Sequence, residues 1–127
     1  MDEMHAIIET SAFISDAAAA GISDDERFEI IDFIAENPTA GAIMPGTGGA
    51  RKIRVAGRGK GKSGGYRVVT CFAAPDIPVF MLAVINKGER TDLSKAEQNA
   101  LKKELSAIAD DYRAGMRRMI AQRMRRN

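Results

Sequence analysis

Three segments between residues 51 and 86 read as β-strands, and they constrain the fold more than any other feature. Residues 51–56 (RKIRVA) alternate polar and apolar side chains, and residues 66–73 (YRVVTCFA) are rich in β-branched and aromatic residues. Residues 78–86 (PVFMLAVIN) are nearly all apolar, as in a central strand that is covered on both faces. Residues 74–77 between the last two segments have the length of a hairpin turn. We therefore expect a small antiparallel sheet.

Helical patterns precede these strands. Residues 5–8 form a short strand-like run, and the alanine-rich residues 11–20 follow as a helix. Residues 23–26 (SDDE) form a capping box, with Ser at the cap and Glu three residues later, and the helix that they open should end before Pro38. Residues 41–50 are loop by composition.

A second capping box, residues 94–97 (SKAE), opens a C-terminal helix with an apolar stripe. Gly115 lies inside this helix and weakens the prediction from there onward. The resulting order is strand, helix, helix, three strands, helix, which is typical of an α+β fold. We expect an antiparallel sheet of three to four strands, packed with N-terminal helices and a C-terminal helix.

Composition excludes several classes of protein. The 127 residues are 45% apolar, enough for one domain with its own core. The longest apolar run falls short of the ~20 residues of a membrane span, and the acidic start lacks the basic region of a signal peptide. A single cysteine, Cys71, fits a reducing cytoplasm. With one histidine, His5, a zinc site is not expected, and we expect structural roles for both residues.

Charge is strongly segregated along the chain. Residues 1–40 hold ten acids and one base, whereas residues 51–67 hold seven bases and no acid. Residues 113–127 hold six arginines and no acid. The basic segments suggest a polyanionic partner, and the acidic segment is either solvated or faces a basic partner.

Residues 56–63 (AGRGKGKS) resemble a nucleotide-binding phosphate loop. Such a loop needs a helix directly after it, because the N–H groups at the helix N-terminus bind the phosphate. Here Gly64 and Gly65 lead into a strand-like segment, so we interpret the stretch as a turn between antiparallel strands. The cationic side chains of this turn are then either solvated or bound to the phosphates of a nucleic acid.

The cations of the strand-like segments have the spacing of a shared face. Lys52 and Arg54 lie two residues apart, opposite the apolar residues of their segment. Antiparallel pairing is expected to bring Lys52, Arg54, Arg67 and Lys87 onto one concave patch that suits a phosphate. We expect no acidic residue to lie between these four cations. Further contacts to RNA are expected from Arg51, Arg58, Lys60, Lys62 and Arg90.

Three stretches together carry a family resemblance. They are residues 36–54 (ENPTAGAIMPGTGGARKIR), 59–69 (GKGKSGGYRVV) and 82–94 (LAVINKGERTDLS). Over about residues 4–110, the chain resembles the RelE superfamily of bacterial type II toxin–antitoxin toxins, and within it the HigB-like branch. The resemblance implies a microbial RNase-type fold over residues 1–112, and residues 113–127 form a basic C-terminal helical extension. The role of this extension stays open between four alternatives: it contacts ribosomal RNA, it contacts an antitoxin, it packs on the sheet, or it is disordered.

The resemblance implies a ribosome-dependent mRNA endoribonuclease that cuts in the ribosomal A site and inhibits translation. Its partners would be the ribosome, mRNA and a cognate antitoxin of helix-turn-helix type, in the cytoplasm and without a membrane. The four catalytic positions implied are Lys52, Arg54, Arg67 and Lys87, with Arg67 on the phosphate and either lysine as general base. No metal and no cofactor are expected. A gyrase-directed or nucleic-acid-binding toxin of the same fold, and a degenerate member that only binds an antitoxin, are the alternatives.

Overall fold

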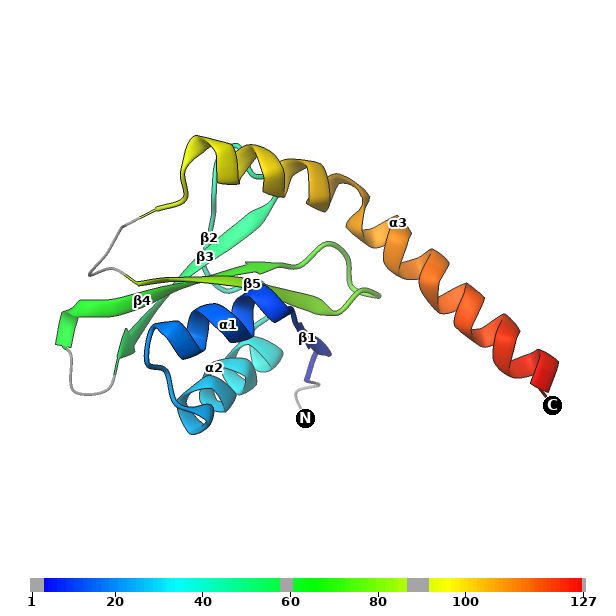
Figure 1. Ribbon diagram of the computed structural model, residues 1–127, viewed down its shortest axis with the longest axis horizontal. Helices are drawn as coiled ribbons and strands as arrows, with labels where there is room; N and C mark the ends of the chain where they lie inside the picture. Colours follow the sequence, from blue (N-terminus) through cyan, green and yellow to red (C-terminus); the bar gives the residue numbers. More distant parts are fainter. Residues whose placement is uncertain (1–3, 58–60, 87–91, 127) are drawn as a thin grey trace.

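The computed structural model describes residues 4–57, 61–86 and 92–126 (Figure 1). Strands and helices follow one another as expected from the sequence, with one additional short strand. The elements are β1 (Ile7–Glu9), α1 (Ser11–Ala19), α2 (Asp24–Glu36), β2 (Ala42–Ile43), β3 (Ala50–Gly57), β4 (Gly61–Cys71), β5 (Val79–Asn86) and α3 (Lys95–Arg126).

The strands form a five-stranded sheet in the order β1-β5-β4-β3-β2. The expected number of three to four strands is wrong, because β2 has only two residues and is too short to show alternation. The expectation of a purely antiparallel sheet is also wrong, since β1 pairs parallel with β5. Alternation marks a segment as a strand but does not give the direction of its neighbour. The antiparallel pairings of β3 with β4 and of β4 with β5 agree with the prediction.

Both predicted capping boxes are present. At α2, the Glu26 amide donates to Ser23 Oγ at 3.2 Å, and the Ser23 amide donates to Glu26 Oε1 at 3.2 Å. The same reciprocal pair forms between Ser94 and Glu97 at the start of α3, at 2.9 and 3.1 Å. α3 continues through Gly115 to Arg126, because one glycine costs only about 1 kcal/mol among strong helix formers.

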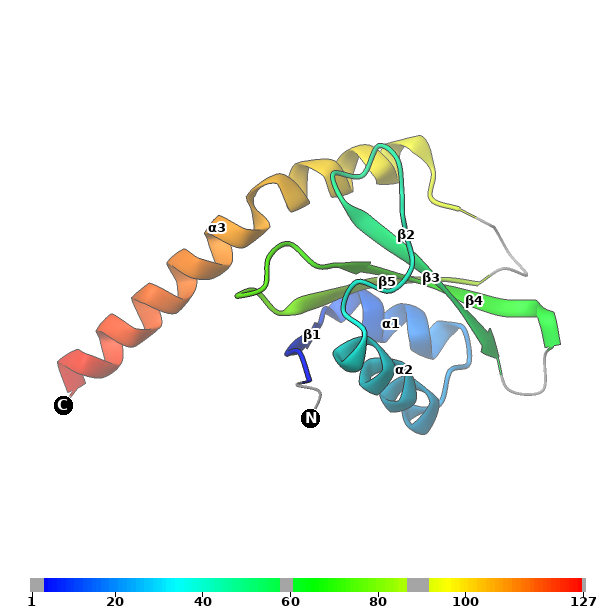
Figure 2. The ribbon, with the colours of Figure 1, turned by 180° about the vertical axis from the view of Figure 1, so that it is seen from behind.

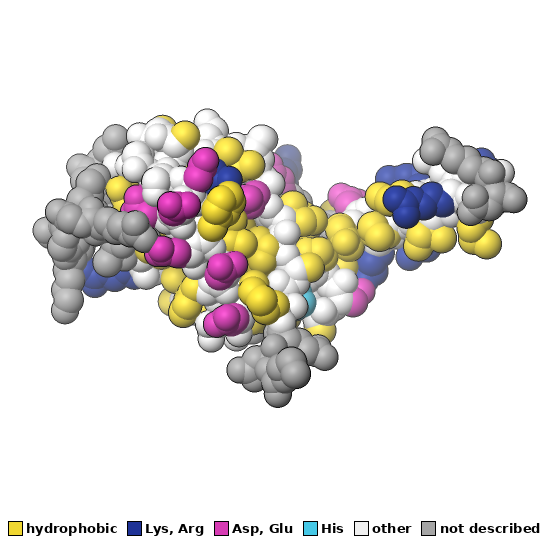
Figure 3. Space-filling view, turned by 90° about the horizontal axis from the view of Figure 1, so that it is seen from below, with side chains coloured by type: hydrophobic (Ala, Val, Ile, Leu, Met, Phe, Trp, Pro, Cys, Tyr) yellow, Lys and Arg dark blue, Asp and Glu magenta, His cyan; other side chains and the backbone are white. Residues whose placement is uncertain are grey.

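Helices cover both faces of the sheet. α1 and α2 pack on one face, around a cluster that includes Phe13, Ile34, Val68 and Met81. α3 packs on the other face over a second cluster that includes Val69, Ile85 and Leu105. Beyond this contact, the C-terminal half of α3 projects away from the sheet (Figure 2). Acidic and apolar side chains lie intermixed over the α1 and α2 side of the molecule (Figure 3).

The stretch that resembles a phosphate loop continues as a strand. β4 begins at Gly61 and runs through Ser63 to Cys71. A helix therefore does not begin after Ser63, and the amide groups that would bind a nucleotide phosphate are absent from this position. The prediction that a strand, and not a helix, follows Ser63 is confirmed.

Candidate nucleic-acid interface

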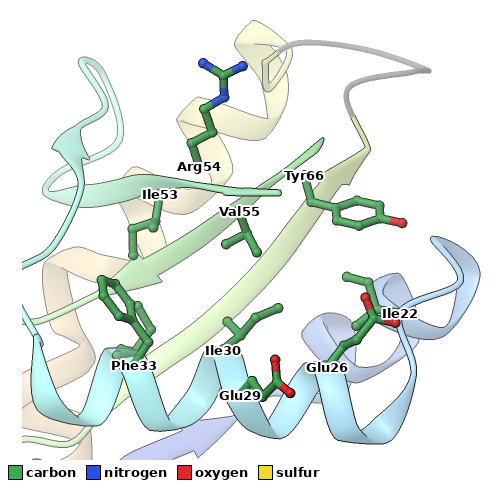
Figure 4. Close-up of a pocket in the computed structure, with 10 residues that line it drawn as sticks. Ile22, Glu26, Glu29, Ile30, Phe33, Ile53, Arg54, Val55 and Tyr66 are labelled. Atoms are coloured by element: carbon green, nitrogen blue, oxygen red, sulfur yellow. The ribbon is translucent and has the colours of Figure 1, made fainter. Parts of the chain in front are cut away.

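Two arginines lie directly opposite each other on neighbouring strands. In the antiparallel register of β3 and β4, Arg54 pairs with Arg67, so both side chains lie on one face of the sheet. This is the α3 face, because Ile53 and Val55 point to the α1 and α2 side, while Arg54 points the opposite way (Figure 4). Opposed residues have Cβ atoms about 5 Å apart, so the two guanidinium groups can bind the same anion.

Arg67 carries an unusual buried donor. Its Nη1 atom is shielded from solvent and lacks a hydrogen-bond partner among the described residues. An unsatisfied buried donor costs about 1–3 kcal/mol, and more when it is charged. Tyr66 beside it does not help, because that side chain lies on the other face and donates its hydroxyl to the carbonyl of Ala20 at 3.2 Å. A phosphate oxygen at this position would satisfy the donor.

Lys52 extends the same face by two residues along β3. Its Nζ atom lies 3.3 Å from Oδ2 of Asp92, three residues before α3 begins at Lys95. The Leu93 amide, and after it the Lys52 ammonium, holds the pKa of the Asp92 carboxyl below its usual value. Asp92 is 51% exposed, so water screens the pair and its main effect is to position Lys52.

Asp92 was missed by the sequence interpretation, which expected no acid among the cations. The sequence feature that could have identified Asp92 is its position two residues before Ser94, because the capping box of Ser94 sets the start of α3. Because α3 packs on the same face of the sheet as Lys52, the residues that precede the helix come close to β3. We refer to Lys52, Arg54, Arg67 and Asp92 as the basic face.

Arg51 is not part of the basic face. It alternates with Lys52 along β3, and its Nη1 donates to the carbonyls of Thr39 and Gly41 at 3.0 and 3.3 Å. These bonds tie the α2–β2 connection to β3. Of the remaining predicted residues, Arg58, Lys60, Lys87 and Arg90 lie outside the described residues, as does the side chain of Lys62.

Two other reactive side chains make structural contacts. His5 Nε2 lies 2.7 Å from the Ile77 carbonyl oxygen, and its ring packs edge-on against Phe72. Cys71 is buried in the sheet, and burial raises the pKa of its thiol. Within the described ranges, histidine, cysteine, aspartate and glutamate do not form a group of three or more that could hold a metal ion. Nor does any helix there have the length and apolar character to cross a membrane.

Fold and site together define a small α+β protein in which one sheet face holds a core and the other gathers cations. A family model described as the RelE toxin of the RelE/RelB toxin–antitoxin system matches residues 6–125. The match covers nearly the whole chain, and the chain belongs to the RelE toxin family. It is thus a toxin of a toxin–antitoxin system, in a family whose members are generally endoribonucleases, and membership implies a cognate antitoxin. The resemblance at the level of the RelE superfamily is confirmed, and the HigB-like branch stays a prediction.

Proposed function

We propose that the chain is a ribosome-dependent mRNA endoribonuclease of the HigB-like branch, acting through its basic face. Family membership supports RNA cleavage. The observation that carries the site is the opposed pair Arg54 and Arg67, in which the buried Nη1 of Arg67 lacks a hydrogen-bond partner among the described residues. Two guanidinium groups on opposed residues can bind one phosphate from both strands. The cognate antitoxin would be of the helix-turn-helix type.

In the proposed reaction, the ribose 2′-hydroxyl attacks the adjacent phosphorus. The bond from O2′ to phosphorus forms as the bond to O5′ breaks, which leaves a 2′,3′-cyclic phosphate and a 5′-hydroxyl. One proton leaves O2′ and one reaches O5′. Because the nucleophile belongs to the RNA, the route needs no cofactor.

Each cation of the basic face has a distinct position for this reaction. Arg67 binds the non-bridging phosphate oxygens, Arg54 binds them from the neighbouring strand, and Lys52 adds positive charge at a position set by Asp92. A preorganised donor of this kind contributes about 2.7–4 kcal/mol to the transition state. Lys52 and Lys87 stay the two candidates for the general base.

The test is mapping of mRNA ends by primer extension after induction of the chain. We expect cuts at codon spacing on translated messages, and their loss from the same message without a start codon. Arg67→Ala and Arg54→Ala should each reduce cleavage by about 100-fold or more. Undiminished cuts in Arg67→Ala would remove the basic face from the mechanism.

Arg51→Ala is the matched control, because it removes an arginine from the same strand but from the opposite face. It should leave cleavage within a few-fold of the native chain once folding is checked by circular dichroism. Intact mRNA together with damaged DNA would instead indicate a gyrase-directed toxin. Intact mRNA and DNA would indicate a chain that only binds its antitoxin.

A further inference from the structure

The end of α3 carries apolar side chains that the other described residues do not cover. Near the middle of α3, Tyr112 packs edge-on against Phe80, and Arg113 donates two hydrogen bonds to Asp76 at 2.7 and 2.8 Å. Residues 116–125 are all exposed. They include four large apolar residues at helical spacing, which we call the tail stripe: Met116, Met119, Ile120 and Met124.

The charge of this segment is uniformly positive. Between residues 114 and 126 there are five arginines and no acid, namely Arg117, Arg118, Arg123, Arg125 and Arg126. An amphipathic helix that is both apolar and basic suits a surface that is both apolar and acidic. Its own body does not offer such a surface within reach, because α3 is one continuous helix that carries the segment away from the sheet (Figures 1 and 2).

A surface of the opposite charge lies on α2. Phe28 and Phe33 are each 50% exposed, and three of the acids between them in helical projection, Asp25, Asp32 and Glu36, are exposed as well. We call these five residues the acidic strip.

A hollow of about 310 Å³ lies beside Phe33 on the side of α2 that faces β3. Apolar side chains including Ile22, Ile30 and Val55 line it, and Glu26 and Glu29 lie at its edge (Figure 4). A methionine fits such an irregular apolar hollow well, because its unbranched side chain adapts to the space.

We propose that the tail stripe of one copy binds the acidic strip and the hollow of a second copy, in a reciprocal dimer. Both surfaces belong to the same chain, so a two-fold axis that places each tail on the strip of the other copy repeats the contact and closes the assembly. The charges match, since residues 1–40 carry ten acids and one base, while residues 113–127 carry six arginines. In the dimer, methionine side chains enter the apolar hollow and arginines lie against the carboxylates of α2.

The first test is sedimentation velocity of the purified full-length chain over a concentration series. The native chain should show a monomer–dimer equilibrium that salt shifts toward monomer, because ionic screening weakens the charged contacts. Ile120→Asp with Met124→Asp should shift the chain to monomer. Ile43→Asp, which places the same charge on a similarly exposed apolar residue of β2, should not. A native chain that is monomeric at every concentration overturns the proposal. The same holds for a monomeric chain whose tail binds RNA instead of a second copy.

A charge exchange tests the pairing itself. The strip variant carries Asp25→Lys, Asp32→Lys and Glu36→Lys, and the tail variant carries Arg117→Glu, Arg118→Glu and Arg125→Glu. Each should be monomeric alone, and an equal mixture should regain the dimer mass, because each tail then meets a strip of opposite charge. A dimer that survives either variant alone, or a mixture that stays monomeric with both variants folded, overturns the proposal.

Discussion

The two faces of the sheet differ in how completely they are covered. On the α1 and α2 face, Phe13 and Val68 are 0% exposed and Ile34 is 1% exposed. On the α3 face, one helix covers only part of the sheet: Val69 and Ile85 are fully buried, but Arg54 on the same face is exposed. The first face supplies a closed core, and the second combines a smaller core with the basic face. On the proposed function, the two faces separate stability from chemistry without a second domain.

Alternation along β3 makes this separation possible. Ile53 points into the closed core, whereas its neighbours Lys52 and Arg54 point to the α3 face. Substitutions in the closed core should therefore change stability with little effect on cleavage, and substitutions of the cations of the basic face should do the reverse.

The largest expected effect is on the closed core. Phe13→Ala removes a fully buried ring and should lower the free energy of unfolding by about 3–5 kcal/mol. Leu105→Ala, under the single helix of the other face, should lower it by about 2 kcal/mol, because water can reach part of the space. Urea denaturation of both variants measures the difference. Equal losses would mean that the two faces are equally closed.

The next effect is at Arg67, where we expect stability and mRNA cleavage to respond differently to one substitution. Arg67→Met keeps most of the side-chain volume. It removes a buried donor that lacks a partner in the described part of the chain, together with one of two opposed positive charges. We expect an unchanged or higher melting temperature together with a loss of mRNA cleavage of about 100-fold or more. A large fall in the melting temperature would show that Arg67 has a structural partner and would weaken its assignment to phosphate binding.

The smallest expected effect is on the pH dependence of stability, through Asp76 and Asp92. Asp76 is bonded by Arg113, and Asp92 by the Leu93 amide and Lys52, so both carboxyl groups have lowered pKa values. A carboxyl group whose pKa is lower in the folded state than in the unfolded state stabilises the fold at pH values above the unfolded-state pKa. This contribution is lost as the pH falls through the folded-state pKa. The stability of the native chain should therefore fall on acidification below about pH 4.

A chain with Asp76→Asn and Asp92→Asn isolates this effect. Its unfolding midpoint should fall less steeply over the same acid range than that of the native chain. Identical pH profiles would show that water screens both pairs completely. Circular dichroism at a series of pH values is sufficient, since only relative midpoints are compared.

Local features of the fold were predictable because short windows of sequence encode them. The capping boxes at Ser23 and Ser94, and the shared face of Lys52 and Arg54, depend on spacings of two or three residues. The two-residue strand β2 shows no such pattern, and the direction of β1 depends on its distant neighbour β5. The family resemblance also followed from the sequence and was confirmed over residues 6–125.

The sequence by itself determined the kinds of elements, their order and the side of β3 on which its cations lie, because neighbouring residues set these properties. Only the tertiary structure placed Arg54 opposite Arg67, brought Asp92 to Lys52, and left the end of α3 without a covering surface. These arrangements join segments that are far apart along the chain. They follow from strand register and from the packing of helices on the sheet, which no short window of sequence contains.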